Sequence, residues 1–123
     1  MRLPKGIYFI GDPCYVIAER QWKNFCNEVF FEYSGKFKGG ESFKGTPLFQ
    51  HGTAYGDGCY TDGAYDYGVD AGVIGATPKS LWGAKFTMKR LKELGRIVTF
   101  NKSFEAFEED GRFYIDDIEI DTN

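Results

Sequence analysis

The sequence predicts an α+β domain with a mostly antiparallel β-sheet, one amphipathic helix at about residues 18–30 and one or two shorter helices at about residues 78–94. Short segments rich in β-branched and aromatic residues are separated by Gly, Pro, Asp and Asn, as in a sheet built from hairpins. Between residues 18 and 30 the spacing of apolar residues changes to a helical period. The chain has 123 residues, 42% of them hydrophobic, and no linker divides it, so we expect a single domain, residues 1–123.

In the N-terminal half, residues 6–10 form the first expected strand, which ends at the turn Gly11-Asp12-Pro13. Residues 14–17 are expected to be extended again. In the helix that follows, four apolar residues are spaced i, i+3, i+4 and i+7 and form one buried stripe. They are Trp22, Phe25, Cys26 and Val29. We interpret Cys26 as a small core residue of this stripe.

The next segments are richer in glycine. Gly39-Gly40 predicts a hairpin or a mobile loop. Residues 47–51 are a possible strand, and residues 69–76 a buried strand whose glycines mark bulges or close backbone approach. Thr77-Pro78 matches the start of a helix, with Thr77 as N-cap and Pro78 in the first turn.

The C-terminal third predicts a helix followed by strands. Residues 86–94 have helical spacing and stop at Gly95. Strands are expected at residues 96–100, 104–108 and 112–115, with a short final strand around residues 118–120. The dipeptide Asp110-Gly111 predicts a tight hairpin between the second and third of these.

Charge and cysteine usage limit the functional classes. The net charge is -3, and a basic block at residues 79–102 is followed directly by an acidic block at residues 103–123. We expect the two blocks to neutralise each other, which argues against nucleic-acid binding. No apolar run is long enough to span a membrane, so no membrane partner is expected. Three cysteines and no signal peptide predict free thiols and a cytoplasmic location.

A segment rich in Gly, Tyr and Asp, residues 51–75, is the candidate recognition surface. It holds seven glycines, four tyrosines and four aspartates, but no lysine or arginine. This mixture supplies rigid aromatic area, polar tips and an adaptable backbone. Alternatively, the tyrosines cover their own sheet and the glycines mark bulges. The candidate binding residues are Tyr55, Asp57, Tyr60, Asp62, Tyr65, Asp66 and Tyr67, assisted by the basic residues Lys85, Lys89 and Arg90.

The pattern Gly-Asp-x-Cys-Tyr occurs twice, with Asp12 and Cys14 in one copy and Asp57 and Cys59 in the other. If the copies lie side by side, the two carboxylates could share a proton, or bind a divalent cation together with other aspartates of the segment. The two thiols could form a redox pair. We favour the simpler interpretation, in which both aspartates form turns and both cysteines are core residues.

No complete catalytic motif is present. His51 is the only histidine, and we interpret it as a polar group at a strand end. The sequence has no nucleophile elbow, no zinc-binding pair of histidines and no phosphate-binding loop. No cysteine pair has the spacing of a zinc site. The chain is therefore expected to bind rather than to catalyse, with no obligatory cofactor.

The segments GDPCYV, YGDGCY and VDAGVIG, together with the closing DGRFYIDDIEIDT, resemble small uncharacterised proteins of bacteria and bacteriophages. The resemblance covers most of the chain. It implies a compact intracellular domain of phage or prophage origin, and it implies no catalytic residues.

Three functions remain open at this stage. The first is a non-enzymatic binding protein that uses residues 51–75 to recognise a host protein or a small anionic, nucleotide-like ligand. The second is a metal-assisted hydrolase with Asp12 and Asp57 as ligands of a divalent cation. The third is a structural or assembly protein that forms a homo-oligomer through an exposed aromatic face.

Overall fold

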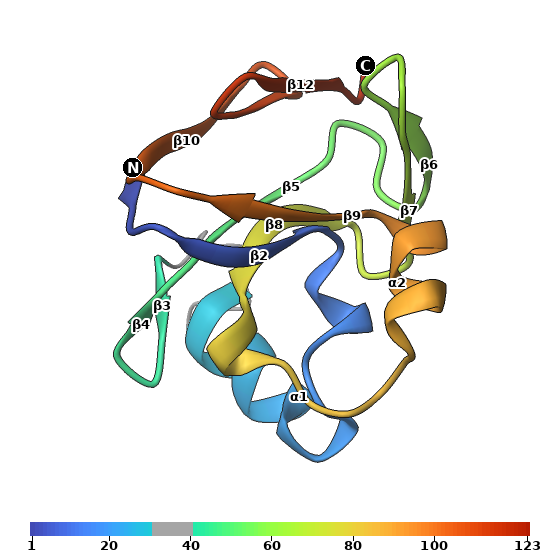
Figure 1. Cartoon of the computed structure of the whole chain (residues 1–123). Helices are drawn as coiled ribbons and strands as arrows, with labels where there is room; N and C mark the ends of the chain where they lie inside the picture. The colour runs from blue at the N-terminus through green and yellow to red at the C-terminus, as the bar shows by residue number, and fades with distance from the viewer. Residues whose placement is uncertain (31–40) are drawn as a thin grey trace.

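A computed structural model of the chain describes residues 1–30 and 41–123 and confirms an α+β fold with mostly antiparallel sheets. Figure 1 shows three layers, with one sheet at the top, a second sheet in the middle and the two helices below. The upper sheet contains, in spatial order, β1 (Arg2–Leu3), β10 (Phe104–Glu109), β11 (Arg112–Ile115) and β12 (Ile118–Asp121). The middle sheet contains β5 (Phe49–Gly52), β8 (Val73–Pro78), β2 (Gly6–Gly11) and β9 (Arg96–Phe100).

Two small hairpins and two helices complete the fold. The hairpins are β3 (Ser42–Phe43) with β4 (Thr46–Pro47), and β6 (Gly58–Thr61) with β7 (Asp66–Val69). Helix α1 (Glu19–Phe25) continues as a π-helix over Cys26–Phe30, and α2 spans Met88–Leu94. Two turns of 3₁₀-helix lie at Pro13–Tyr15 and Lys79–Leu81.

Alternation along the central strand β2 explains how one sheet has apolar groups on both faces. Successive side chains of a strand point to opposite faces. Tyr8 and Ile10 therefore enter the main core between the two sheets, together with Phe113 of β11. Phe9 points to the helical layer, where it packs with Leu91 of α2. A strand that is buried on both faces carries apolar residues without polar alternation, as the sequence of β2 does.

The helix at residues 18–30 has the expected apolar stripe. Phe25 and Val29 are fully buried against Phe43, and Trp22 and Cys26 pack partly buried at the margin of the same cluster. Burial raises the pKa of the Cys26 thiol, which is consistent with a core role.

One turn prediction and one prediction of close backbone approach are confirmed. Asp110 and Gly111 have φ angles of 52° and 82° at the turn between β10 and β11. Gly75 in β8 lies so close to β5 that a Cβ atom there would be 2.1 Å from the carbonyl oxygen of Phe49. The hairpin expected at Gly39-Gly40 falls outside the described residues. Among the described residues, the hairpin β3–β4 turns at Lys44 and Gly45, with φ angles of 51° and 79°.

Three local predictions are wrong. Residues 69–76 are not one strand, because residues 70–72 form the bend between β7 and β8. Residues 14–17 are not extended, because Asp12 accepts a hydrogen bond from the Cys14 N–H and caps the 3₁₀-helix Pro13–Tyr15. Thr77 does not cap a helix, because it lies in β8 and pairs with Phe9 of β2; the helical turn that follows is the 3₁₀-helix Lys79–Leu81, with Pro78 as its N-cap. The helix expected at residues 86–94 is confirmed as α2, which begins at Met88 with Thr87 as N-cap; Thr87 Oγ1 accepts a hydrogen bond from the Arg90 N–H at 3.1 Å.

Candidate functional site

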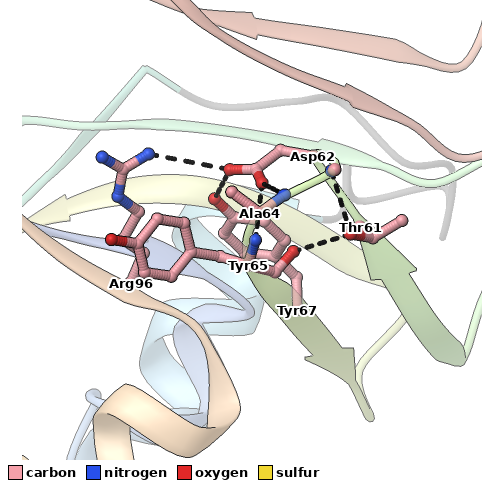
Figure 2. Close-up of polar contacts among 7 residues, drawn as sticks. Thr61, Asp62, Ala64, Tyr65, Tyr67 and Arg96 are labelled. Atoms are coloured by element: carbon pink, nitrogen blue, oxygen red, sulfur yellow. Dashed lines mark hydrogen bonds and ion pairs between the residues drawn. The ribbon is translucent and has the colours of Figure 1, made fainter.

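The loop that joins β6 to β7 is held by a single carboxylate, that of Asp62 (Figure 2). Asp62 Oδ1 accepts hydrogen bonds from the N–H groups of Ala64 at 2.8 Å and Tyr65 at 2.7 Å. Its Oδ2 accepts the hydroxyl proton of Tyr67 at 2.6 Å. Thr61 Oγ1 donates to the Tyr65 carbonyl at 2.9 Å and accepts from the Gly63 N–H at 3.0 Å. These contacts fix a loop that the glycine-rich sequence would otherwise leave adaptable.

Arg96, the first residue of β9, connects this loop to the middle sheet. Its Nη1 lies 3.6 Å from Asp62 Oδ2, and its guanidinium carbon lies 4.3 Å from the centroid of the Tyr65 ring. Figure 2 shows the guanidinium beside both the carboxylate and the ring. The arrangement combines an ion pair with a cation–π contact, which positions the Arg96 side chain on two sides.

The Asp62 side chain is only 7% exposed. Burial on its own raises the pKa of this carboxyl, but hydrogen bonds from the Tyr67 hydroxyl and the two N–H groups, together with Arg96, lower it further than burial raises it. The net effect is a pKa below the ordinary value, so Asp62 stays ionised at neutral pH.

A shallow groove of about 430 Å³ runs beside this cluster along β9. We call it the β9 groove and define it by its lining residues. These are Tyr65, Lys92, Gly95, Arg96, Ile97, Val98 and Thr99. In the described part of the chain β9 pairs with β2 alone, so it is an edge strand of the middle sheet. The groove therefore combines two cations, one aromatic ring and an open strand edge.

The structure separates the tyrosines of residues 51–75 into two groups. Tyr67 is fully buried in the core between the sheets, and Tyr60 is partly buried with its hydroxyl donating to the Gly56 carbonyl at 2.9 Å. Tyr65 is 46% exposed and Tyr55 is 77% exposed. The segment thus covers its own sheet with one pair of rings and presents the other pair at the surface.

The aspartates also divide. Asp57 and Asp66 are exposed, whereas Asp62 supports its own loop from within. Two of the expected binding residues are therefore largely inaccessible to a partner, because Tyr67 is fully buried in the main core and the Asp62 side chain is 7% exposed.

Of the three basic residues singled out from the sequence, two are engaged elsewhere. Lys85 Nζ donates to the Cys14 carbonyl at 2.8 Å and lies 3.1 Å from Glu19 Oε2, and Arg90 pairs with Glu93 on the same helix at 2.7 Å. Lys89 is exposed. Within the described residues, the ion pairs of the basic block are made with Glu19, Glu93 and Asp62, and none is made with the acidic block at residues 103–123.

Sequence reasoning did not single out Lys92 and Arg96, the two cations of the groove. Lys92 occupies the last turn of α2, and Arg96 follows Gly95 directly. The helix stop at Gly95 was visible in the sequence. The chain turns there from α2 into β9, so that Lys92 and Arg96 line the same groove. Nothing local indicates that Arg96 reaches a loop 34 positions earlier.

The two copies of Gly-Asp-x-Cys-Tyr have different structures but approach the same bend. Asp12 is fully buried, and its Oδ2 accepts the N–H groups of Asp70 at 2.9 Å and Ala71 at 2.6 Å. Asp57 is exposed, and its Oδ1 would lie 3.8 Å from a Cβ atom placed on Gly72. The first copy is a 3₁₀-helix and the second enters strand β6.

The environment of Asp12 is that of a carboxyl group which organises backbone. Burial raises the pKa of this carboxyl, while the N–H groups of Ala71, Cys14 and Asp70 oppose the rise. Burial and the neighbouring Asp12 also raise the pKa of the Cys14 thiol, which keeps it protonated. Among the residues that the structure describes, no group of three or more His, Cys, Asp or Glu side chains is arranged to hold a metal ion.

His51 lies at the end of β5 and faces the upper sheet. Its Nδ1 is 3.1 Å from Glu108 Oε2 and 2.9 Å from the Gly52 carbonyl oxygen. These contacts agree with the interpretation of His51 as a polar group at a strand end. The His51–Glu108 pair thus connects β5 of the middle sheet to β10 of the upper sheet.

Comparison of the chain with protein-family models, curated proteins and solved structures gives no match. Within residues 1–30 and 41–123, the helices are too short to cross a membrane.

Proposed function

We propose that this protein is a non-enzymatic binding protein whose β9 groove recognises an anionic partner. The observation that carries the proposal is the position of Arg96, which Asp62 and Tyr65 hold beside an open strand edge. With Lys92 on the same groove, two cations converge on one concave surface. The proposal includes a cytoplasmic location and the phage or prophage origin that the sequence resemblance implies.

A fixed loop favours binding. Seven glycines in residues 51–75 would make a mobile loop costly to order on association. Asp62 and Thr61 order residues 62–65 in the free protein, so a partner meets Tyr65 already in place. Arg96 is 31% exposed and has five N–H donors, of which the Asp62 contact at 3.6 Å uses only part. The remaining donors suit a carboxylate or another planar anion.

A host protein that presents carboxylates fits this groove better than a nucleotide does. One face of the Tyr65 ring is covered by the Arg96 guanidinium at 4.3 Å, so that face is closed to a stacking base. The groove is also an open channel along a strand and not an enclosed cavity that would bury a small ligand. A small anionic, nucleotide-like ligand is therefore the second candidate partner.

The proposal is tested by titrating the ¹⁵N-labelled protein with hexaglutamate and, separately, with AMP, and following the backbone amides by NMR. Hexaglutamate should shift amides around Tyr65, Lys92 and Arg96, whereas AMP should shift them weakly or not at all. Lys92→Glu should weaken the hexaglutamate effect by about tenfold, because it replaces an attraction by a repulsion at one contact.

Lys89→Glu is the matched control for this experiment. It makes the same charge change on the same helix, but Lys89 is not part of the groove. If both variants weaken binding equally, or if the shifts are spread over all basic residues, hexaglutamate responds only to net charge and the groove is not the site.

A further inference from the structure

The edge of β9 is not used within the described part of the chain. Strand order places β9 at the end of the middle sheet, so backbone N–H and C=O groups on its outer side have no strand partner there. Its sequence, Arg96 to Phe100, contains no proline and no glycine to disrupt pairing. An edge of this kind is a template for another strand.

Two hollows adjoin this edge and share Arg96, Val98 and Thr99 as lining residues. The first is the β9 groove, to which Lys92 of α2 adds a second cation. The second has a volume of about 400 Å³; its apolar lining comes from Val98, Phe100, Phe104 and Ile118, and its charged lining includes Arg96, Lys102, Asp116 and Asp117. Arg96 and Val98 pair with Ile10 and Tyr8 of β2, so they lie on the face of the sheet that is turned towards the main core. Alternate side chains of an added strand would lie on this same face, beside Arg96, Val98 and Phe100.

We infer that an extended acidic segment of the partner protein adds to β9 as a fifth strand of the middle sheet. This inference rests on the proposed function and names the form in which the partner binds. Main-chain hydrogen bonds to β9 supply affinity that is independent of sequence. One acidic side chain meets Lys92 and Arg96, and an apolar side chain enters the second hollow beside Val98 and Phe100.

Charge distinguishes this occupant from a second copy of the chain. Cations flank both ends of the edge, with Lys92 and Arg96 at its start and Lys102 just beyond its end. Antiparallel pairing of two copies would bring Lys102 of one towards Arg96 of the other. Lysines at a strand edge are a common protection against such self-pairing. An acidic residue beside Lys92 and Arg96 is attracted instead, whereas the Lys102 end also carries Asp116 and Asp117 and therefore suits the apolar part of the segment.

The first test selects ligands without assuming their sequence. The full wild-type chain is immobilised and screened with a random twelve-residue peptide library, with the bare support for counter-selection. Selected peptides should contain Asp or Glu near an apolar residue, bind wild-type and Lys89→Glu protein equally, and bind Lys92→Glu about tenfold more weakly. Amides of β9 should exchange with solvent more slowly when the peptide is bound.

The second test probes strand addition directly. An added strand uses only alternate peptide N–H groups for pairing, and the others point away from β9. Two forms of one selected peptide are therefore made, N-methylated at odd or at even positions. One form should bind at least about thirtyfold more weakly than the parent, because its pairing donors are lost, and the other should stay within about threefold.

The outcomes separate the inference from the proposed function. If acidic peptides depend on Lys92 but both methylated forms bind alike, the groove binds anions and strand addition is wrong. If no acidic peptide is selected, or none depends on Lys92, both ideas fail. If the protein alone forms a dimer in light scattering with β9 amides protected, a second copy occupies the edge and the inference is overturned.

Discussion

Replacement of Asp12 by alanine should destabilise the protein by about 3 kcal/mol. The Asp12 carboxyl accepts three backbone hydrogen bonds, from Cys14, Asp70 and Ala71, at 2.9, 2.9 and 2.6 Å. A hydrogen bond contributes about 1 kcal/mol when neutral and about 1.5–3 kcal/mol when the acceptor is charged. We use the lower value for each bond, because Asp70 and Ala71 lie in an exposed bend where water can replace part of the lost contact.

Urea unfolding followed by the fluorescence of Trp22 and Trp82 measures this loss. For a chain of this size, about 3 kcal/mol corresponds to a fall in the urea midpoint of roughly 1.5–2 M. Asp57→Ala is the matched control, since Asp57 is the equivalent residue of the second Gly-Asp-x-Cys-Tyr copy and is exposed. It should change stability by less than about 0.5 kcal/mol. A loss below about 1 kcal/mol for Asp12→Ala, or equal losses for both variants, would refute the assignment of Asp12 as the structural carboxyl.

Three further predictions follow from other contacts. Gly75→Ala should prevent native pairing of β5 with β8, because the added Cβ would lie 2.1 Å from the Phe49 carbonyl oxygen, and the loss of cooperative unfolding in circular dichroism would show this. Gly52→Ala, where the added Cβ would make only an ordinary contact of 3.8 Å with the Gly72 carbonyl oxygen, is the control and should still unfold cooperatively. Asp62→Asn should remove a stabilisation that the wild-type protein has above the ordinary Asp pKa of 3.8 and loses as pH falls through the lowered pKa of the folded state. The urea midpoints of wild type and variant, measured from about pH 2 to about pH 7, should therefore converge at the acid end, and a constant difference between them would contradict the ionised pairing. When the folded protein is titrated with Ellman's reagent, one cysteine should react rapidly, because Cys59 is exposed while burial raises the pKa of the Cys14 and Cys26 thiols. Cys59→Ser should abolish the rapid phase, and a rapid phase that survives this substitution would contradict the prediction.

Most of the fold could be predicted because its signals are local. The strands at residues 6–10 and 96–115 combine β-forming residues with turn dipeptides that fix where each strand ends. Asp110-Gly111 is the clearest case, since its two positive φ angles are those that a tight hairpin requires. The amphipathic stripe of α1 and the π-helix that continues it was predictable for the same reason: four side chains at helical spacing pack in one cluster.

The failures occurred where tertiary pairing overrides a local preference. Thr77-Pro78 is a helix start by composition, but β2 offers strand pairing partners for both residues at Phe9 and Tyr8. Pro78 lies beyond Ala76, where pairing of β8 with β5 ends, so β8 is paired on one side only at this residue, as at a sheet edge. Residues 14–17 are apolar enough for a strand, but the neighbouring Asp12 carboxyl accepts a hydrogen bond from the Cys14 N–H and caps a 3₁₀-helix. The sequence alone does not show that Thr77-Pro78 would pair with β2, or that Asp12 would cap residues 13–15 rather than let them extend.

The candidate site was predictable only in part. Composition identified residues 51–75, and Tyr65 does lie at the surface. Composition could not separate exposed rings from buried ones. Tyr65 and Tyr67 are only two positions apart on a hairpin, and they differ in exposure because Tyr67 packs in the main core whereas Tyr65 does not. Arg96 was beyond reach, since its contact with Asp62 joins segments far apart in sequence.

Two carboxyl groups explain how a glycine-rich segment can present a defined surface. Asp12 binds the backbone at residues 70 and 71, and Asp62 closes residues 62–65 and pairs with Arg96. The segment is thus fastened to the 3₁₀-helix at one point and to β9 at another, and the glycines supply conformations that the fastening needs rather than freedom of motion. Because the ordering cost is met during folding, a partner at the β9 groove would meet a preformed surface. A glycine-rich composition is therefore compatible with a rigid segment when buried carboxyl groups hold its backbone. In this protein the contacts of Asp62 determine how Tyr65 is presented at the surface.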